Sequence, residues 1–375
     1  MDAFARRRQR LARSVRDAGL DVLLVNSVVN VSYLTGFTGD SSWLIMGSKR
    51  CLLVSDGRYT EQIKNECPGL AVHIRKTEQT VIQALGEVLP KLGVRNVGVE
   101  AAHLSLAEFE ALKDAAPALS WSPQKKLVEN LRLIKEPDEV RQIREAIHFA
   151  ERAYDMFRAL LRPGDTEKEL TDAMEGYVRR AGARCSSFPP IVAIGDNSAQ
   201  PHAPITARRV DESPFLLLDW GASGEFYKSD ITRALVTGEA AGGRGREKVE
   251  SRLEKLYTVV LTAQQRALSA VRPGVKAGDI DAAVRAYLKD EGYNEYFNHG
   301  LGHGIGLQVH EGPNIRANSP DVIEAGMVFT LEPGVYLTGF AGVRIEDDVL
   351  VTPDGCEVLT RLPKDPAAVF RPASV

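Results

Sequence analysis

The sequence of 375 residues contains only four cysteines, and no two of them form a closely spaced pair. They are scattered along the chain, at Cys51, Cys67, Cys185 and Cys356. A zinc ribbon or a disulfide-stabilised secreted domain needs cysteines in pairs or in a regular framework, so the sequence excludes both classes. We therefore expect reduced cysteines and a cytoplasmic protein.

Long apolar runs and a surplus of positive charge are also missing. No run approaches the ~20 apolar residues of a membrane-spanning helix. The basic N-terminus precedes an apolar run of only about five residues, which is too short for a signal peptide. With 47 basic and 50 acidic residues the net charge is −3, so no basic surface for nucleic acid is expected. The sequence predicts a globular protein with neither a membrane nor a nucleic acid as partner.

The chain is long enough for two hydrophobic cores. Its first part alternates short apolar runs with amphipathic segments, which predicts an α/β domain with a mixed or parallel sheet. Strands are expected at 23–25, 43–46, 51–54, 71–74 and 96–99, and helices at 81–92 and 106–115. The pattern lapses around residues 121–128, and a long helix begins near Pro137. We place the boundary there, which gives domains of residues 1–130 and 131–375.

The second domain contains an internal repeat. The tripeptide Arg-Pro-Gly occurs at 162–164 and at 272–274, and the same offset of 110 aligns Gly182 with Gly292. Each tripeptide lies between two expected helices, and the second helix ends at a glycine suited to that position. Strands are expected at 191–194 and 215–237 in one half, and at 304–310 and 327–351 in the other. The repeat predicts a pseudo-twofold α/β sandwich with a site where its halves meet.

A hairpin in the first half carries two aspartates. If it folds about Gly224 and Glu225, Asp219 and Asp230 lie opposite one another. Like charges on paired strands destabilise a sheet, and aspartate is a poor strand former. A cation shared by the two carboxylates would offset that repulsion.

A hairpin in the second half repeats this feature with glutamates. Folding about Gly339 sets Glu332 opposite Glu346. A single acid of this kind is usually a solvated charge at a strand end. Two independent pairs, one in each half of a repeat, instead predict a metal site.

The segment between the two hairpins is rich in histidine and glycine. Three of the seven histidines, His299, His303 and His310, fall within twelve residues, and glycines alternate from Gly300 to Gly306. Glycine permits the close approach of backbone to a ligand. Isolated histidines are more often core or surface residues, but this cluster predicts part of a site.

Charge arithmetic favours two ions over one. Four converging carboxylates carry −4, which two divalent cations carrying +4 balance. Paired ions in hydrolases lie ~3.5–4 Å apart and activate a shared water. An oxygen-rich donor set with one imidazole favours Mn²⁺, with Co²⁺, Fe²⁺ and Zn²⁺ as alternatives.

These motifs resemble those of the metal-dependent pita-bread peptidases, the family of aminopeptidase P, prolidase and methionine aminopeptidase. The resemblance is strongest in LLLDWGASGEFYKSDITR, HGLGHGIGLQVHEGP, TLEPGVY and GVRIEDD. It implies a C-terminal pita-bread domain in which Asp230 and Glu346 bridge the ions. The complete set of metal ligands that it implies is Asp219, Asp230, His303, Glu332 and Glu346.

The N-terminal domain resembles the creatinase-type domain of the proline-specific members. Its blocks are Tyr33-Leu-Thr-Gly-Phe and Asp56-Gly-Arg-Tyr. The resemblance implies catalytic roles for His202, His310 and Glu332, and substrate-binding roles for His299, Tyr336 and Arg344. Trp220 and Ile205-Thr206 depart from the usual family pattern.

The implied activity is hydrolysis of the bond between an N-terminal residue and a following proline in a small peptide. Asn314 stands where prolidase-like members often have an arginine, with Arg316 two residues further, so an Xaa-Pro aminopeptidase is favoured and an Xaa-Pro dipeptidase is the alternative. A creatinase-like hydrolase and a non-catalytic peptide-binding protein are remoter alternatives, which the intact ligand set opposes. Relatives are commonly dimers, so a homodimer is expected.

Overall fold

The computed structural model describes residues 2–237 and 246–370. The chain divides into two compact units, Met1–Arg132 and Leu133–Val375. Within the described residues, no helix is long and apolar enough to cross a membrane. All four cysteines are free, as expected.

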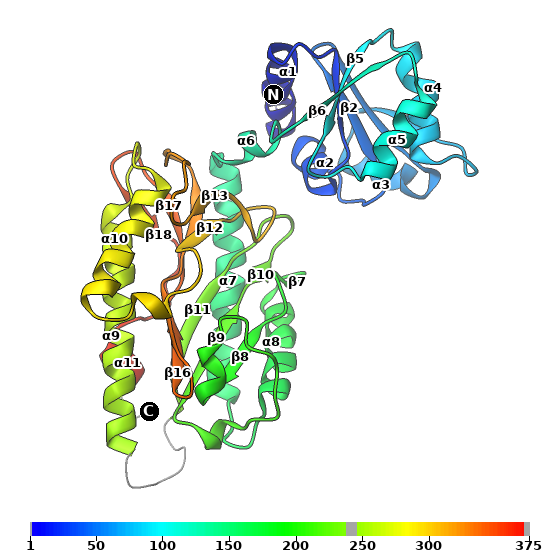
Figure 1. Ribbon diagram of the computed structural model, residues 1–375. Coiled ribbons are helices and arrows are strands. Elements are labelled where there is room, and N and C mark those ends of the chain that lie inside the picture. Colours follow the sequence, from blue (N-terminus) through cyan, green and yellow to red (C-terminus); the bar gives the residue numbers. More distant parts are fainter. Residues whose placement is uncertain (1, 238–245, 371–375) are drawn as a thin grey trace. The chain divides into compact units, whose positions relative to one another are not determined.

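The N-terminal unit is a six-stranded mixed sheet with helices on both faces (Figure 1). The strand order is β4-β3-β2-β1-β5-β6. The strands are β1 (Val22–Val25), β2 (Trp43–Gly47), β3 (Arg50–Ser55), β4 (Ala71–Ile74), β5 (Asn96–Glu100) and β6 (Ser120–Gln124). The helices are α1 (Ala3–Asp17), α2 (Val28–Thr35), α3 (Thr60–Glu66), α4 (Val81–Lys91), α5 (Leu106–Ala115) and α6 (Glu129–Arg132), with a 3₁₀ turn η1 (Gly57–Tyr59).

Burial on both faces explains why the central strands of this sheet are continuously apolar. All four residues of β1 are buried, and Val22 and Leu24 join a core with Leu85 and Leu89 of α4. Every strand and helix expected in this unit is observed. The lapse predicted at 121–128 is wrong in part, because β6 pairs in parallel with β5 there. Pro123 obscured this strand, and proline is tolerated because β6 is an edge strand.

The C-terminal unit contains two helix pairs with strands between them (Figure 1). The helices are α7 (Pro137–Leu160), α8 (Glu167–Ala181), α9 (Arg246–Ala270), α10 (Ala277–Asp290) and the short α11 (Pro366–Phe370). The strands of the first half are β7 (Cys185–Ser186), β8 (Ile191–Ile194), β9 (Phe215–Trp220), β10 (Ala222–Ser223) and β11 (Ile231–Val236). Those of the second are β12 (Gly302–Gly304), β13 (Glu311–Ile315), β14 (Val328–Leu331), β15 (Gly334–Leu337), β16 (Ala341–Arg344), β17 (Asp347–Val351) and β18 (Cys356–Val358). The 3₁₀ turns are η2 (Gly195–Ala199), η3 (Val210–Glu212) and η4 (Asn294–Tyr296).

The predicted repeat appears as two equivalent helix pairs. Each Arg-Pro-Gly tripeptide joins two long helices, α7 to α8 and α9 to α10. Gly182 and Gly292 follow the second helix of each pair with φ angles of 122° and 79°, which favour glycine. Buried residues such as Val260, Val284 and Phe329 join α9 and α10 to the strands of the second half. The helix and strand order predicted for each half is therefore observed.

The register predicted for the first hairpin is wrong by two residues. Asp219 pairs with Thr232, and the isolated bridge between Ser223 and Lys228 centres the turn on Glu225 and Phe226. A shift of two keeps every side chain on its original face, because the strand period is two. Asp219 and Asp230 therefore still share a face, as diagonal neighbours.

The register predicted for the second hairpin is confirmed. Gly334 pairs with Arg344 and Leu331 pairs with Asp347, and both pairs are in line with Glu332 opposite Glu346. Gly339, with a φ of 74°, forms the turn.

The strand predicted at 304–310 is wrong beyond its first residue. Strand β12 ends at Gly304, and the chain then forms a loop up to His310. The amide of Gln308 donates to the side chain of Glu311 (3.3 Å) rather than to a neighbouring strand. This loop places His310 off the sheet.

Candidate metal centre

A cavity of about 570 Å³ opens in the C-terminal unit, within the usual size range for small-ligand sites. Its walls come from both halves of the repeat. All but one of the site residues predicted from the sequence line it: His202, Asp219, Asp230, His299, His303, His310, Glu332, Arg344 and Glu346. The exception is Tyr336, which is buried behind the wall.

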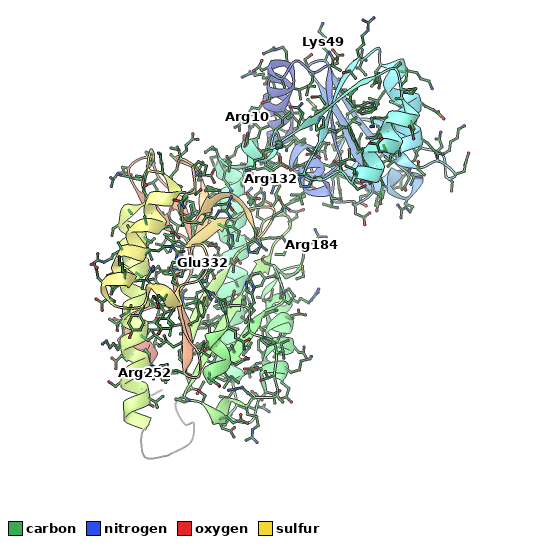
Figure 2. All side chains as sticks on the ribbon, viewed as in Figure 1. Arg10, Lys49, Arg132, Arg184, Arg252 and Glu332 are labelled. Atoms are coloured by element: carbon green, nitrogen blue, oxygen red, sulfur yellow. The ribbon has the colours of Figure 1, made fainter. Side chains whose placement is uncertain are left out.

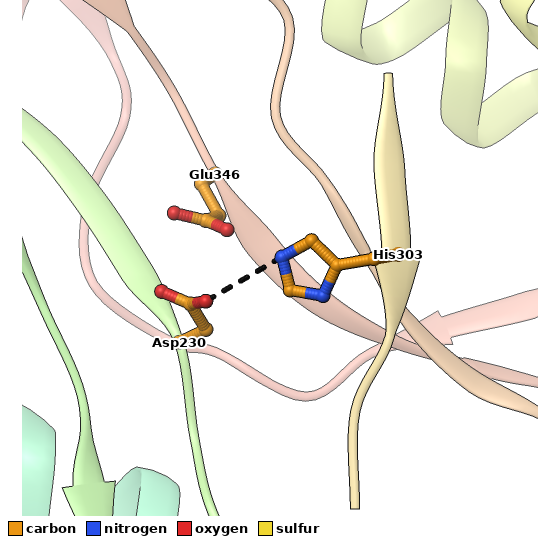
Figure 3. A group of neighbouring side chains, drawn as sticks. All are labelled: Asp230, His303 and Glu346. Carbon is orange, nitrogen blue, oxygen red and sulfur yellow. Dashed lines mark ion pairs between the residues drawn. The ribbon is translucent and has the colours of Figure 1, made fainter. Parts of the chain in front are cut away.

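Three of these side chains form a compact group of ligand type. Asp230 precedes β11, His303 lies in β12, and Glu346 lies between β16 and β17. Their ligand atoms all lie within 4.8 Å of one another, and they point toward a common centre (Figure 3). His303 Nε2 is 3.6 Å from Asp230 Oδ2. One imidazole and two carboxylates at this spacing are suited to hold a divalent cation.

Glu332 and Asp219 extend the group on either side. Glu332 lies in the interior of the unit, between the helix pairs (Figure 2), with Oε1 at 3.4 Å from His303 Nε2. Asp219 Oδ2 accepts a hydrogen bond from Arg344 (2.5 Å), but its Oδ1 is buried and has no hydrogen-bond partner among the described residues. A buried carboxylate oxygen left unpaired inside an acidic cluster is one that a bound cation would satisfy. The residues present therefore fit a pair of metal ions.

Burial and mutual repulsion perturb these acids strongly. Burial raises the pKa of Asp230 well above its usual value, and the negative charges of Glu346 and Asp219 raise it further. Burial likewise raises the pKa of Glu346 well above its usual value, and the negative charge of Glu332 adds to the rise. Burial also raises the pKa of Glu332 to about 8, although Arg344 opposes the shift. Without cations the cluster therefore holds protons near neutral pH, which metal ions would displace.

His303 is in the chemical form that a metal ligand requires. Burial lowers its pKa to about 4, so the imidazole is neutral at pH 7. Its backbone amide donates to Thr330 Oγ1 (3.1 Å), and its Nδ1 is 3.2 Å from Gly304 O. That contact leaves Nε2, the atom nearest the carboxylates, with a free lone pair.

Three supporting residues escaped the sequence prediction. Thr232 Oγ1 donates to Glu346 Oε2 (2.6 Å), and Thr330 Oγ1 donates to Glu332 Oε1 (3.3 Å). Asp348 Oδ2 accepts from the amide of Asp230 (3.2 Å). Each lies two positions from a predicted ligand, at Asp230, Glu332 and Glu346 respectively. Since residues i and i+2 of a strand share a face, the period of two could have found them.

Arg344 and Tyr336 connect the carboxylates to His299. Arg344 donates to Asp219 Oδ2, to Thr232 Oγ1 (3.0 Å) and to Tyr336 Oη (2.8 Å). Tyr336 Oη is 2.9 Å from His299 Nε2, and His299 Nδ1 is 2.7 Å from Gly300 O. Burial lowers the pKa of His299 to about 4. A neutral His299 with its proton on Nδ1 satisfies this chain, with Tyr336 donating to Nε2.

His202 and His310 lie on loops rather than on strands. The rings of His310 and His303 are 4.3 Å apart between centroids. Burial lowers the pKa of His310, with a further contribution from the neighbouring His202. A neutral imidazole here can donate one N–H to an oxygen in the cavity.

Trp220, a departure from the usual pattern, has a structural role. Its side chain is fully buried and stacks on Tyr154 of α7, with 5.2 Å between ring centroids. Its indole N–H donates to Ala150 O (3.0 Å). These contacts fix the end of β9 next to Asp219.

Comparisons with known families match both parts of the chain. Residues 141–353 match the family described as metallopeptidase family M24. Residues 7–134 match the creatinase/prolidase N-terminal domain. The architecture is thus a creatinase-type N-terminal domain followed by a pita-bread domain, as the sequence motifs indicated.

Individual relatives are similar over nearly their whole length. The uncharacterized peptidase YqhT of Bacillus subtilis is 33% identical over 347 residues, which cover 92% of this chain and 95% of that protein. A solved Xaa-Pro dipeptidase from Bacillus anthracis is 35% identical with a TM-score of 0.89, covering 96% of this chain and 99% of that one. A solved X-Pro aminopeptidase from Thermotoga maritima is 34% identical with a TM-score of 0.85, covering 94% and 99%.

Proposed function

Since the chain belongs to metallopeptidase family M24, we propose that it is a two-metal exopeptidase that cleaves the bond between an N-terminal residue and a following proline. The observation that carries this proposal is the convergence of four carboxylates and a neutral histidine, from both halves of the repeat, on one cavity.

The residues that would hold the metal ions are the set predicted from the sequence, in which Asp230 and Glu346 would serve both ions. When bound, the ions would supply an activated water and polarise the scissile carbonyl. We propose Mn²⁺ as the metal, because the four carboxylates of the set outnumber its single imidazole. The ligand set is Asp219, Asp230, His303, Glu332 and Glu346.

The side chains around the ligands would handle protons and orient the peptide. Glu332, a carboxylate beside His303 in the cavity wall, would accept a proton and pass it to the proline nitrogen. His202 and His310 would donate hydrogen bonds to the carbonyl oxygen as charge develops there. Tyr336 does not line the cavity, so we assign it the orientation of His299 and Arg344 rather than contact with the peptide.

Substrate length separates two candidates. Asn314, uncharged, lies in the cavity wall, which favours an aminopeptidase acting on longer peptides. Arg316 also lines the cavity, and it forms no ion pair with any residue in the described part of the chain. A free guanidinium is suited to bind the C-terminal carboxylate of a dipeptide, so an Xaa-Pro dipeptidase is the second candidate.

Hydrolysis of Xaa-Pro against Xaa-Pro-Xaa, after chelation and again after Mn²⁺ addition, tests the proposal. Manganese-dependent release of the first residue from the tripeptide, with little dipeptide turnover, supports the aminopeptidase. Turnover of the dipeptide alone supports the dipeptidase. No cleavage of either substrate by metal-loaded protein would contradict proline specificity.

We propose a homodimer in the cytoplasm. Light scattering that gave a monomer mass under assay conditions would contradict the dimer.

A further inference from the structure

Glu167 is a buried carboxylate far along the chain from the metal ligands. It is the first residue of α8, and its side chain is fully inaccessible to solvent. Oε1 accepts from the amide of Ile194 (2.7 Å), and Oε2 accepts from the amide (2.8 Å) and hydroxyl (2.6 Å) of Thr206. The side-chain amide of Asn197 is 3.0 Å from both oxygens. All four donors belong to the segment from Ile194 to Thr206.

The position of Glu167 explains how a charge is tolerated there. It lies at the N-terminus of a helix, where the macrodipole favours negative charge. Four N–H and O–H donors surround its carboxylate, and such charge-assisted hydrogen bonds are stronger than neutral ones. Removal of that charge would therefore release both ends of the segment together.

The segment that Glu167 holds carries His202 into the cavity. The His202 side chain lines the cavity and, within residues 2–237 and 246–370, makes no hydrogen bond of its own. Its place is therefore set by the backbone of the segment. Inside the segment, Asn197 donates to Pro204 O (3.0 Å) and Gln200 donates to Asn197 Oδ1 (3.0 Å), so the loop closes around the carboxylate.

A second connection leads from this segment to the second half of the repeat. The amide of Gly342 in β16 donates to Ser198 Oγ (2.8 Å). Arg344, two residues further, donates to Pro201 O (3.3 Å), next to His202. The segment is thus fixed at its ends by Glu167 and at its middle by β16.

We infer that Glu167 is a positioning residue for His202: it fixes the loop that aims this histidine at the scissile carbonyl without touching substrate or metal. The inference rests on the proposed function, because it assigns to His202 a hydrogen bond to the substrate. No other described side chain accepts hydrogen bonds from both ends of the segment.

Glu167→Gln is the direct test because neither orientation of a glutamine amide fits. A backbone N–H points at each carboxylate oxygen, one from Ile194 and one from Thr206. Whichever side receives the NH₂ group places donor against donor. The loop must then shift, and displacements of about 1 Å at a reacting centre lower rates by about 10²-fold.

The experiment is a double-mutant cycle on Xaa-Pro hydrolysis by the Mn²⁺-loaded full-length protein. We expect Glu167→Gln to lower kcat by about 10–10²-fold in the native background, with the bound metal unchanged. In a His202→Ala background the same change should lower kcat by less than about threefold, because coupled residues are not additive. Equal factors in both backgrounds would overturn the inference, since they would show a general structural effect.

Glu169→Gln is the matched control on the same helix turn. Glu169 is exposed, and within the described part of the chain its side chain accepts hydrogen bonds only from Thr166. A glutamine at position 169 can make the same capping contact. It should leave kcat unchanged in both backgrounds. A loss equal to that of Glu167→Gln would overturn the inference, because it would show that the helix start rather than the buried carboxylate matters.

A milder variant covers the case in which Glu167→Gln does not fold. Thr206→Val removes one hydroxyl donor from Glu167 at nearly constant volume. We expect a fall in kcat of about three- to tenfold that disappears in the His202→Ala background. A fall that persists there would overturn the inference.

Amide hydrogen exchange separates failure of this inference from failure of the proposed function. If the native protein cleaves no Xaa-Pro substrate, the proposed function fails and the catalytic part of the inference fails with it. Protection at Ile194 and Thr206, lost in Glu167→Gln and retained in Glu169→Gln, would still show that Glu167 fixes the loop. If the native protein cleaves Xaa-Pro substrates but Glu167→Gln lowers kcat by the same factor with and without His202, the role of Glu167 is overturned and the proposed function stands.

Discussion

The two halves of the C-terminal unit share their order of helices and strands but contribute to the site differently. The first half supplies two aspartates from one hairpin, whereas the second supplies His303 and two glutamates. In both halves the metal-ligand candidates lie in strands or directly beside them.

The halves are alike in placing a cavity histidine on an anchored loop. Glu167 holds the loop of His202, and Glu311 holds that of His310 by accepting from the amide of Gln308 and pairing with the buried Lys135 (3.0 Å). In the proposed function, sheet positions would therefore provide the metal ligands, and anchored loops would provide the hydrogen-bond donors. Variants in the two classes should separate metal content from turnover.

The largest effect is expected at a shared ligand. Asp230→Asn keeps the size of the side chain but removes a charge that faces Glu346 and His303. We expect loss of bound Mn²⁺ and a fall in kcat of about 10³-fold or more, since metal ions contribute several kcal/mol to such reactions. Elemental analysis and Xaa-Pro hydrolysis measure both. Asp172→Asn, on the exposed face of α8, is the control, and two ions retained by Asp230→Asn would contradict the assignment.

The next effect concerns a loop histidine. His310→Ala should lower kcat by about 10²–10³-fold, the range for removal of one oxyanion donor, while two metal ions remain bound. His148→Ala, on the exposed face of α7, should change neither quantity. Parallel loss of metal and activity would instead make His310 a ligand and remove the distinction between strands and loops.

A smaller effect is expected behind the cavity wall. Tyr336→Phe removes the hydroxyl that lies between Arg344 and His299. We expect kcat/KM to fall about tenfold, as for groups that orient metal ligands from outside. Steady-state kinetics measure it, with the exposed Tyr296→Phe as control. An unchanged kcat/KM would show that the function of His299 does not depend on the Tyr336 hydroxyl.

The last prediction concerns the pH dependence of stability in the metal-free protein. Burial raises the pKa of Glu332 to about 8, against roughly 4.3 in an unfolded chain. The folded state then binds more protons than the unfolded state between these values, so stability falls as pH rises through that window. Thermal melts of chelated protein at about pH 5 and about pH 9 measure it, and Mn²⁺ or Glu332→Gln should reduce the difference. Greater stability of the chelated protein at the higher pH would contradict this account.

The sequence predicted a hairpin correctly where the glycine in its turn has a backbone conformation that favours glycine. Gly339 has a positive φ, and the register of its hairpin was predicted correctly. Gly224 has no positive φ and little around it, and the hairpin predicted there was shifted by two. The glycine that this hairpin requires is Gly221, where a Cβ would lie 1.9 Å from Ser229 O.

The candidate site was predictable where side chains of one kind repeat, and not where support is distant in sequence. Paired acids and clustered histidines identified seven residues that line the cavity, and the family resemblance added His202 and Arg344. Glu167 precedes His202 by 35 positions, and its role depends on four donors that only the folded loop brings together. A lone glutamate in the first turn of a helix has an ordinary explanation as a favourable helix-end charge. The sequence pattern does not predict contacts between residues that lie far apart in the chain.

The most direct test of the central claim is a titration of chelated protein with Mn²⁺, in which bound metal and Xaa-Pro hydrolysis are followed together. We expect two ions per chain at saturation, with Asp230→Asn abolishing binding and His310→Ala leaving it intact. A stoichiometry of one or none, or full activity without metal, would contradict a centre built jointly by the two halves.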